Sequence, residues 1–164
     1  MGCLINLPLL TLAALGLYSR SKAKEHLIGW FFRGYPKSDF LNLCEHFADA
    51  HECIIRDSAI EEIKRHQKSN HIVIIITASP IEWVIPFAKK LGIPIVLGTQ
   101  LEYTSEGKLT GHFSSKNCTG SEKVKALLTR FPNREQYTLY TYGDSSGDKE
   151  LLDFSDYKYF RKLK

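Results

Sequence analysis

The hydrophobic pattern divides the chain into two regions. In the first, apolar positions recur at helical spacing, and we predict three helices with breaks near Ser19–Ser21 and Gly34–Lys37. In the second, helical segments alternate with short runs of β-branched residues, which is the pattern of an α/β fold with a parallel sheet. We therefore expect a helical region over residues 1–56 and an α/β region over residues 57–164.

The strands of the second region are marked by short apolar runs. HIVIIIT is a continuous β-branched run and indicates a strand buried on both faces. Alternating residues around Glu106-Gly107 indicate a β-hairpin. The expected elements are strands at His71–Thr77, Pro94–Thr99 and Tyr137–Tyr142 and a hairpin over Leu101–Phe113.

Three helices of the second region are predicted to begin at capping boxes. In this motif a hydroxyl side chain and an acid three residues later each satisfy a free backbone amide. Pro80 falls at the first helical position of the second helix, where proline is favoured. The three pairs are Ser58–Glu61, which opens a helix through about Lys68, then Ser79–Glu82, and finally Thr119–Glu122.

Polar residues follow two of the predicted strands directly. Thr77 comes just before a predicted helix N-terminus, where free amides attract anions. Asp144 and Asp148 lie in the tight connection after the last apolar run, and two carboxylates there suit a hard cation such as Mg²⁺. Lys123 lies in the first turn of a helix, a poor place for a cation, which indicates either a specific task or a solvated surface side chain.

Composition limits the classes of partner. The 164 residues fit a single domain, and the apolar share of 43% is ordinary for a globular protein. The formal charge of +4 fits anionic substrates or a membrane surface, but it is too small and scattered to indicate nucleic acid. We interpret the basic clusters Arg20–Lys24 and Arg161–Lys164 as solvated ends of elements.

The four cysteines show neither a C-x-x-C spacing nor a disulfide framework, so a reducing, cytoplasmic setting is the simplest interpretation. On a helix, His46, Asp49 and Cys53 would share a face and suggest a metal site. We favour instead an amphipathic helix with two small buried thiols, because zinc usually needs four well-placed ligands.

The apolar segment Leu4–Tyr18 precedes the basic cluster. It is short for a membrane span, which needs about 20 apolar residues, and it lacks the basic start of a secretory signal. An interfacial or partly buried helix is compatible with it. The expected location is therefore cytoplasmic, with peripheral association at the inner face of the membrane as an option.

Three segments resemble motifs of the haloacid dehalogenase superfamily of phosphohydrolases. They are TASPIEWV at Thr77–Val84, GTQLEYTSEGKLTG at Gly98–Gly111 and NCTGSEKVKALL at Asn117–Leu128, followed by the paired aspartates. The resemblance is greatest to the phosphoserine-phosphatase-like branch and, within it, to bacterial phosphatidylglycerophosphatase C-type proteins. It implies a Rossmann-like parallel sheet flanked by helices, with the N-terminal helical region as a cap.

The resemblance also implies roles for individual residues. Thr77, with Ala78 and Ser79, would hold phosphoryl oxygens, and Lys123 would neutralise their charge. Asp144 and Asp148 would form the Mg²⁺ site. Asp148 would support this site in part through Lys123 or a water molecule. Thr77, Lys123 and Asp148 would thus be the catalytic set, and the substrate a phosphorylated small molecule or a lipid head group.

One motif of the superfamily, Asp-x-Asp-x-Thr, does not occur in these 164 residues. In relatives it supplies the aspartate nucleophile and ends the first strand, which lies centrally between the strands leading to Thr77 and Asp144. Either the natural protein extends upstream of Met1 or the chain is a degenerate relative, and we favour the first. The alternative function is a non-catalytic module that binds phosphate ligands.

Overall fold

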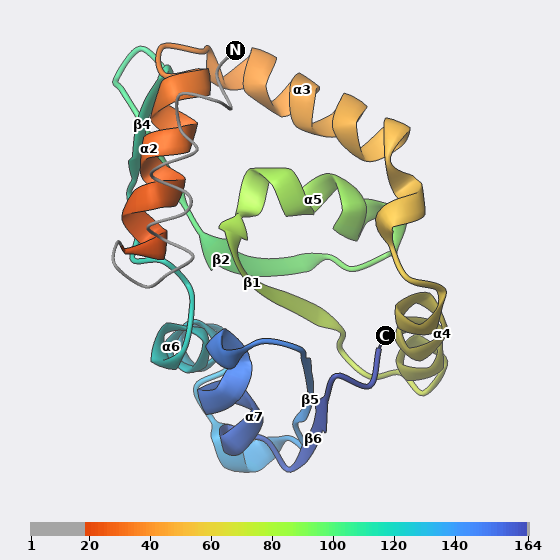
Figure 1. The fold of residues 1–164 in the computed structure, drawn as a ribbon. Helices are drawn as coiled ribbons and strands as arrows, with labels where there is room; N and C mark the ends of the chain where they lie inside the picture. The colour runs from red at the N-terminus through yellow and green to blue at the C-terminus, as the bar shows by residue number, and fades with distance from the viewer. Residues whose placement is uncertain (1–18, 164) are drawn as a thin grey trace.

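The computed structural model describes residues 19–163 and begins with a helical region. Ser19 caps the first described helix, and its side chain accepts a hydrogen bond from the amide of Lys22. The helices are α2 (Arg20–Phe32), α3 (Lys37–Ala50) and α4 (Asp57–Lys68), with a short 3-10 turn at Glu52–Ile54 (Figure 1). The breaks predicted near residues 19–21 and 34–37 are confirmed, while the helix expected at Leu4–Tyr18 lies outside the described residues.

The remaining residues alternate between strands and helices, as the sequence predicts. The final element, β6, lies beyond the last strand that the apolar runs indicate. The elements are β1 (Ile74–Pro80), α5 (Ile81–Lys90), β2 (Ile95–Thr99), β3 (Leu101–Tyr103), β4 (Leu109–Phe113), α6 (Ser121–Arg130), β5 (Tyr140–Gly143), α7 (Lys149–Phe154) and β6 (Tyr157–Phe160), with 3-10 turns at Arg134–Gln136 and Ser146–Asp148.

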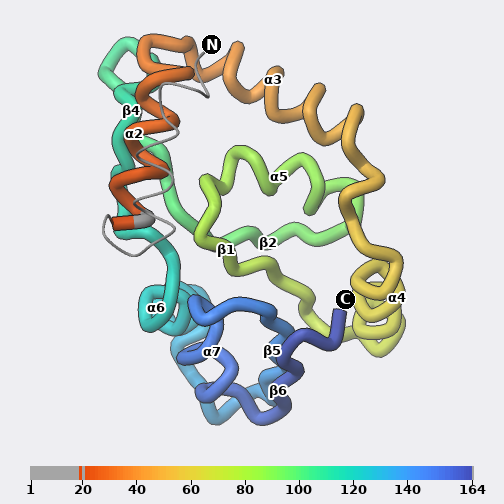
Figure 2. Tube along the Cα trace, in the orientation of Figure 1, coloured from red at the N-terminus to blue at the C-terminus, as the bar shows by residue number. Residues whose placement is uncertain are grey.

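The strands of residues 19–163 form three separate two-stranded sheets. The pairs β1–β2 and β5–β6 are parallel, and β3–β4 is the predicted antiparallel hairpin. Figure 2 shows the two parallel pairs as distinct units. β1 is half-buried along most of its length, so the interpretation of full burial was wrong. The reason is that β1 has a strand neighbour on one edge only, and its other edge lines a pocket shared with β5.

None of the three predicted capping boxes forms. The hydroxyl of Ser58 lies inside α4 without a hydrogen-bond partner in the described part of the chain. β1 continues through Pro80, so Ser79 belongs to the strand and caps nothing. Gly120 is the N-cap residue of α6 and adopts a φ of 58°, so the Thr119 side chain does not reach the helix amides. The helices exist as predicted, and the start of α5 is set by the pairing of β1 with β2 as far as Pro80.

A small hydrophobic core joins the helical region to the hairpin. Its buried members are Ile28, Phe40, Cys44, Leu101 and Leu109. α2 packs directly on β4, where Gly29 and Gly111 bring the two backbones together; a Cβ added at Gly111 would lie 2.4 Å from the Gly29 Cα. The hairpin therefore packs with the helices of residues 20–50, and the division at residue 56 stays a prediction.

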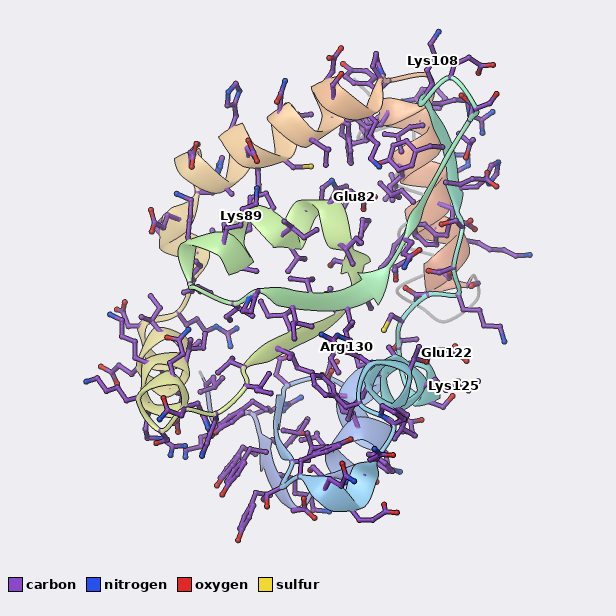
Figure 3. All side chains as sticks on the ribbon, turned by 180° about the vertical axis from the view of Figure 1, so that it is seen from behind. Glu82, Lys89, Lys108, Glu122, Lys125 and Arg130 are labelled. Atoms are coloured by element: carbon purple, nitrogen blue, oxygen red, sulfur yellow. The ribbon has the colours of Figure 1, made fainter. Side chains whose placement is uncertain are left out.

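Charged pairs connect α3 with α5. Lys89 points from α5 toward α3 (Figure 3), and its Nζ lies 3.1 Å from the Glu45 carboxylate. Lys90 makes a second pair, 2.9 Å from Asp49. α3 packs on α5, which in turn packs against β1 and β2, and these partly exposed pairs lie at the edge of that contact.

The thiols on this part of the chain differ in environment. Cys44 is buried, and burial together with the carboxylates of Glu82 and Glu45 raises its pKa to about 12. Cys53 is exposed, so the expectation of two buried thiols is wrong for one of them, because Cys53 lies in the 3-10 turn after α3 has ended. No cluster of three metal-binding side chains occurs in residues 19–163.

Candidate functional site

The end of β1 forms a tight, hydrogen-bonded turn at the site. Thr77 accepts a hydrogen bond from the Ser79 amide through its Oγ1 at 3.0 Å. The carbonyl of Ala78 accepts two side-chain hydrogen bonds, from Lys24 Nζ of α2 at 3.1 Å and from Thr99 Oγ1 of β2 at 3.0 Å. Helix, strand and turn are thereby fixed to one another, which places the Thr77 side chain and the following α5 N-terminus at one end of the sheet.

Lys123 is buried although it lies in the first turn of α6, which excludes the interpretation as a solvated side chain. Its Nζ donates to Asp148 Oδ1 at 2.6 Å and to the carbonyl of Ile76 at 3.0 Å. The ammonium therefore joins β1 to the loop that follows β5. A buried cation in this position needs both acceptors, because a charge removed from water is costly without a partner.

Asp148 uses both carboxylate oxygens inside the protein. Oδ1 accepts from Lys123, and Oδ2 accepts from the amides of Asp144 and Ser145 at 3.2 and 3.0 Å and from Ser145 Oγ at 2.7 Å. Burial raises the pKa of Asp148, but hydrogen bonds from Lys123 and Ser145 outweigh it, and the pKa lies below its usual value. Asp148 thus positions Lys123 and shapes the loop.

Asp144 occupies the rim of the same pocket and points away from Asp148. Its carboxylate is 61% exposed and lies 3.9 Å from the Arg56 guanidinium. The two aspartates are four residues apart in sequence, which predicts that they act as a pair. In the described structure, the contact between them is the hydrogen bond that the Asp144 amide donates to Asp148 Oδ2. Of the two pocket aspartates, Asp144 therefore has the carboxylate that is accessible from solvent, although it also faces Arg56.

A pocket of about 430 Å³ separates β1 from β5 and contains all the predicted site residues. Its walls also carry Arg56, Arg161 and Lys162, which the sequence analysis did not assign to the site. Arg56 comes from the segment before α4, and the other two follow β6. The sequence shows Arg161 and Lys162 only as part of the basic cluster Arg161–Lys164, predicted to be a solvated end, and the fold brings both to the pocket with Arg56. Together with Lys123 they give the pocket a positive lining suited to an anion.

Acid should weaken the fold through Asp148. Because its folded pKa is depressed, its stabilising contribution is complete above the usual carboxyl pKa of 3.8 and is lost as pH falls through the lower folded value. We expect the free energy of unfolding, measured by urea titration, to fall below about pH 4 and to fall less steeply in Asp148→Asn. High salt should screen exposed pairs such as Arg134–Asp156 but not this buried one. An unchanged acid slope in Asp148→Asn would contradict the assignment.

The chain belongs to the haloacid dehalogenase-like hydrolase family, whose pattern matches residues 2–153. It is also similar to Protein CicA of two Caulobacter vibrioides strains, at 32% identity over 144 residues, 87% of this chain and 64% of the relative. The chain thus spans less than two thirds of the length of these curated relatives.

Solved structures share the fold. A protein of unknown function from Bordetella pertussis Tohama I superposes with a TM-score of 0.78 at 19% identity, covering 89% of this chain and 67% of that one. A phospho-aspartyl intermediate analogue of phosphoserine phosphatase gives a TM-score of 0.64 at 18% identity, covering 93% of this chain and 70% of the other. The expected α/β fold of the family is confirmed.

Proposed function

We propose that these residues form the phosphate site of a Mg²⁺-dependent phosphohydrolase that acts on a phosphomonoester. The observation that carries the proposal is the buried ammonium of Lys123, held between Asp148 and the carbonyl of Ile76 next to Thr77. A fixed cation, a hydroxyl and the backbone at the end of β1, all lining one pocket, are suited to phosphoryl oxygens.

Each group has a defined part in binding. The Thr77 hydroxyl and the amide of Ala78 would donate to phosphoryl oxygens, and the Ser79 amide, which donates to Thr77 Oγ1 in the structure, would orient that hydroxyl or turn to the phosphate. Lys123 would neutralise the phosphoryl charge as it spreads in the transition state. Asp148 would keep the ammonium in place without touching the substrate. Because Lys123 is already positioned by protein acceptors, it needs little reorganisation when the anion arrives.

The residues present fit Mg²⁺ in part. Asp144 is exposed at the pocket rim, where it pairs loosely with Arg56, and Mg²⁺ is commonly bound by one or two carboxylates together with phosphate oxygens and water. When bound, the ion would neutralise charge on the transferred phosphoryl group. We propose that Asp144 binds it and that the carboxylate of Asp148, which is fully hydrogen-bonded, supports the loop behind it.

The nucleophile is the missing element of this proposal. The 164 residues contain no Asp-x-Asp, and of the two pocket aspartates one is paired with Lys123 and the other faces Arg56. We propose that an extended segment carrying the Asp-x-Asp-x-Thr motif fills the space between β1 and β5 in the active protein. The open edges of β1 and β5 along this pocket support such an arrangement.

The proposed substrate is a phosphorylated small molecule or a lipid head group such as phosphatidylglycerophosphate. The resemblance to the C-type lipid phosphatases supports the lipid, whereas the solved phosphoserine phosphatases support a small phosphomonoester. The alternative function, a non-catalytic phosphate-binding module, would use the same pocket and is favoured by the missing motif.

Phosphate binding tests the site directly. We expect Thr77→Val to weaken the binding of inorganic phosphate about tenfold or more in calorimetry, because a hydrogen bond to a charged group contributes about 1.5–3 kcal/mol. Thr129→Val is a matched control, since Thr129 is exposed on α6 and its hydroxyl bonds only the carbonyl of Lys125. Equal affinities in the two variants would place the phosphate elsewhere.

Hydrolysis then separates the two functions. With Mg²⁺ and a phosphomonoester, the 164-residue chain alone should bind without turnover. Addition of a synthetic peptide containing Asp-x-Asp-x-Thr should start turnover that Lys123→Met abolishes. Turnover by the chain alone would contradict the proposed nucleophile, and binding without turnover in the presence of the peptide would favour the binding module.

A further inference from the structure

The outward face of α2 carries a stripe of cations around an exposed tryptophan. Lys22, His26 and Trp30 follow at spacings of four residues and share one face of the helix. Arg33, the C-cap residue, follows three residues later, and its guanidinium lies at the edge of this face, beside Gly29 and Gly111. All four side chains are exposed, and Trp30 has an exposed fraction of 52%. We call these four residues the outer α2 face. Such exposure of a large aromatic side chain beside cations requires an explanation, because the opposite face of α2 already provides the packing contacts.

The inward face of α2 holds the helix against the hairpin. Ile28 is buried in the core, and Gly29 touches the backbone of Gly111 in β4. Glu25 is the only acidic residue of α2, and its carboxylate accepts a hydrogen bond from the Phe113 amide at 2.9 Å. The negative charge of the helix is therefore directed to β4, and the outer α2 face keeps only cationic, imidazole and indole groups.

The end of the helix adds exposed aromatic side chains. Phe31 and Tyr35 are 43% and 44% exposed, and Lys37 follows at the start of α3. Lys108, at the tip of the hairpin, lies at the same end of the molecule (Figure 3). Lys37 and Lys108 each have an exposed acid two residues away, Asp39 and Glu106. Indole and phenol groups favour the head-group layer of a membrane, and lysine and arginine are attracted to anionic lipids.

We propose that the outer α2 face docks on the surface of a membrane rich in anionic phospholipids. Charge complementarity selects this occupant, since the face carries cations and no carboxylate. The described residues contain no helix long and apolar enough to span a bilayer. In the proposed contact, α2 lies on the membrane surface. This inference goes beyond the proposed function, because docking requires neither phosphate binding nor hydrolysis.

The same helix connects the docking face to the phosphate site. Lys24, on the side of α2 opposite to the outer α2 face, donates to the carbonyl of Ala78 in the turn after β1. A helix lying on lipid would thereby keep this turn one helix diameter, roughly 10 Å, behind the docked face.

Vesicle sedimentation of the full 164-residue chain tests the proposal. We expect binding to vesicles of mixed phosphatidylcholine and phosphatidylglycerol, weakening with added salt, and little binding to phosphatidylcholine alone. The double variant Lys22→Glu/Arg33→Glu should lower the affinity for anionic vesicles at least about 25-fold, since each cation near the surface contributes about fivefold. Trp30→Ala should weaken the remaining binding further.

A matched variant controls for net charge. Lys64→Glu/Arg130→Glu changes the charge by the same amount at exposed positions on α4 and α6, and it should bind anionic vesicles at nearly the unmodified affinity. Equal losses in the two double variants, equal binding to neutral vesicles, or no binding at all would each overturn the proposal. Phosphate affinity should be the same in both variants, which verifies folding and separates failure of docking from failure of the phosphate site. If Trp30→Ala does not fold, Trp30→Gln serves in its place.

Discussion

Replacing Lys123 with methionine should lower the free energy of unfolding by about 3 kcal/mol and abolish phosphate binding. Methionine fills a similar space but leaves the carboxylate of Asp148 buried without its cation and the carbonyl of Ile76 without its donor. Urea unfolding would measure the loss of stability, and calorimetric titration with inorganic phosphate would measure the loss of binding.

Lys125→Met is the control on the same helix. Lys125 is exposed and pairs only with Glu122, three residues earlier. Such surface pairs contribute little, so we expect a change below about 0.5 kcal/mol and an unchanged phosphate affinity. Similar losses in the two variants would show that the buried Lys123–Asp148 pair has no special role.

Gly111→Ala should destabilise the protein by about 3 kcal/mol through the contact of α2 with β4. Gly111 adopts a φ of +88°, and its added methyl group would lie 2.4 Å from the Gly29 Cα, which is backbone and cannot rotate away. Either the helix or the strand would have to shift. Thermal or urea unfolding would measure the effect.

Gly34→Ala separates the two causes of this loss. Gly34 has a nearly equal φ of +85°, but nothing lies within 4 Å of an added Cβ. It should therefore show the backbone cost alone, about 1 kcal/mol. If both variants lose the same amount, the close approach of α2 and β4 contributes nothing to stability.

Much of the fold could be predicted because it depends on local patterns. The β-branched run ending at Thr77 and the alternation around Glu106-Gly107 carry their own periodicity, and the structure forms β1 and the hairpin there. Lys123 could also be identified, since a lysine in the first turn of a helix is electrostatically unfavourable without a partner. Its burial excludes the alternative of a solvated surface lysine, and its role at the site stays a prediction.

Other features depend on contacts between distant segments. The start of α5 shifts past Ser79 because β1 continues its pairing with β2 as far as Pro80. Asp144 and Asp148 look equivalent in sequence, but only Asp148 faces Lys123, while Asp144 turns toward Arg56. Arg161 enters the pocket because β6 pairs with β5, and nothing near it in the sequence indicates that pairing.

The most direct test of the account is a nuclear magnetic resonance titration of the isotope-labelled chain with inorganic phosphate. The account predicts that the amides of Ala78 and Ser79 and the ammonium of Lys123 shift together and saturate at one affinity, which Lys123→Met removes. Shifts confined to other basic segments, or shifts that persist unchanged in Lys123→Met, would show that the pocket between β1 and β5 is not a phosphate site.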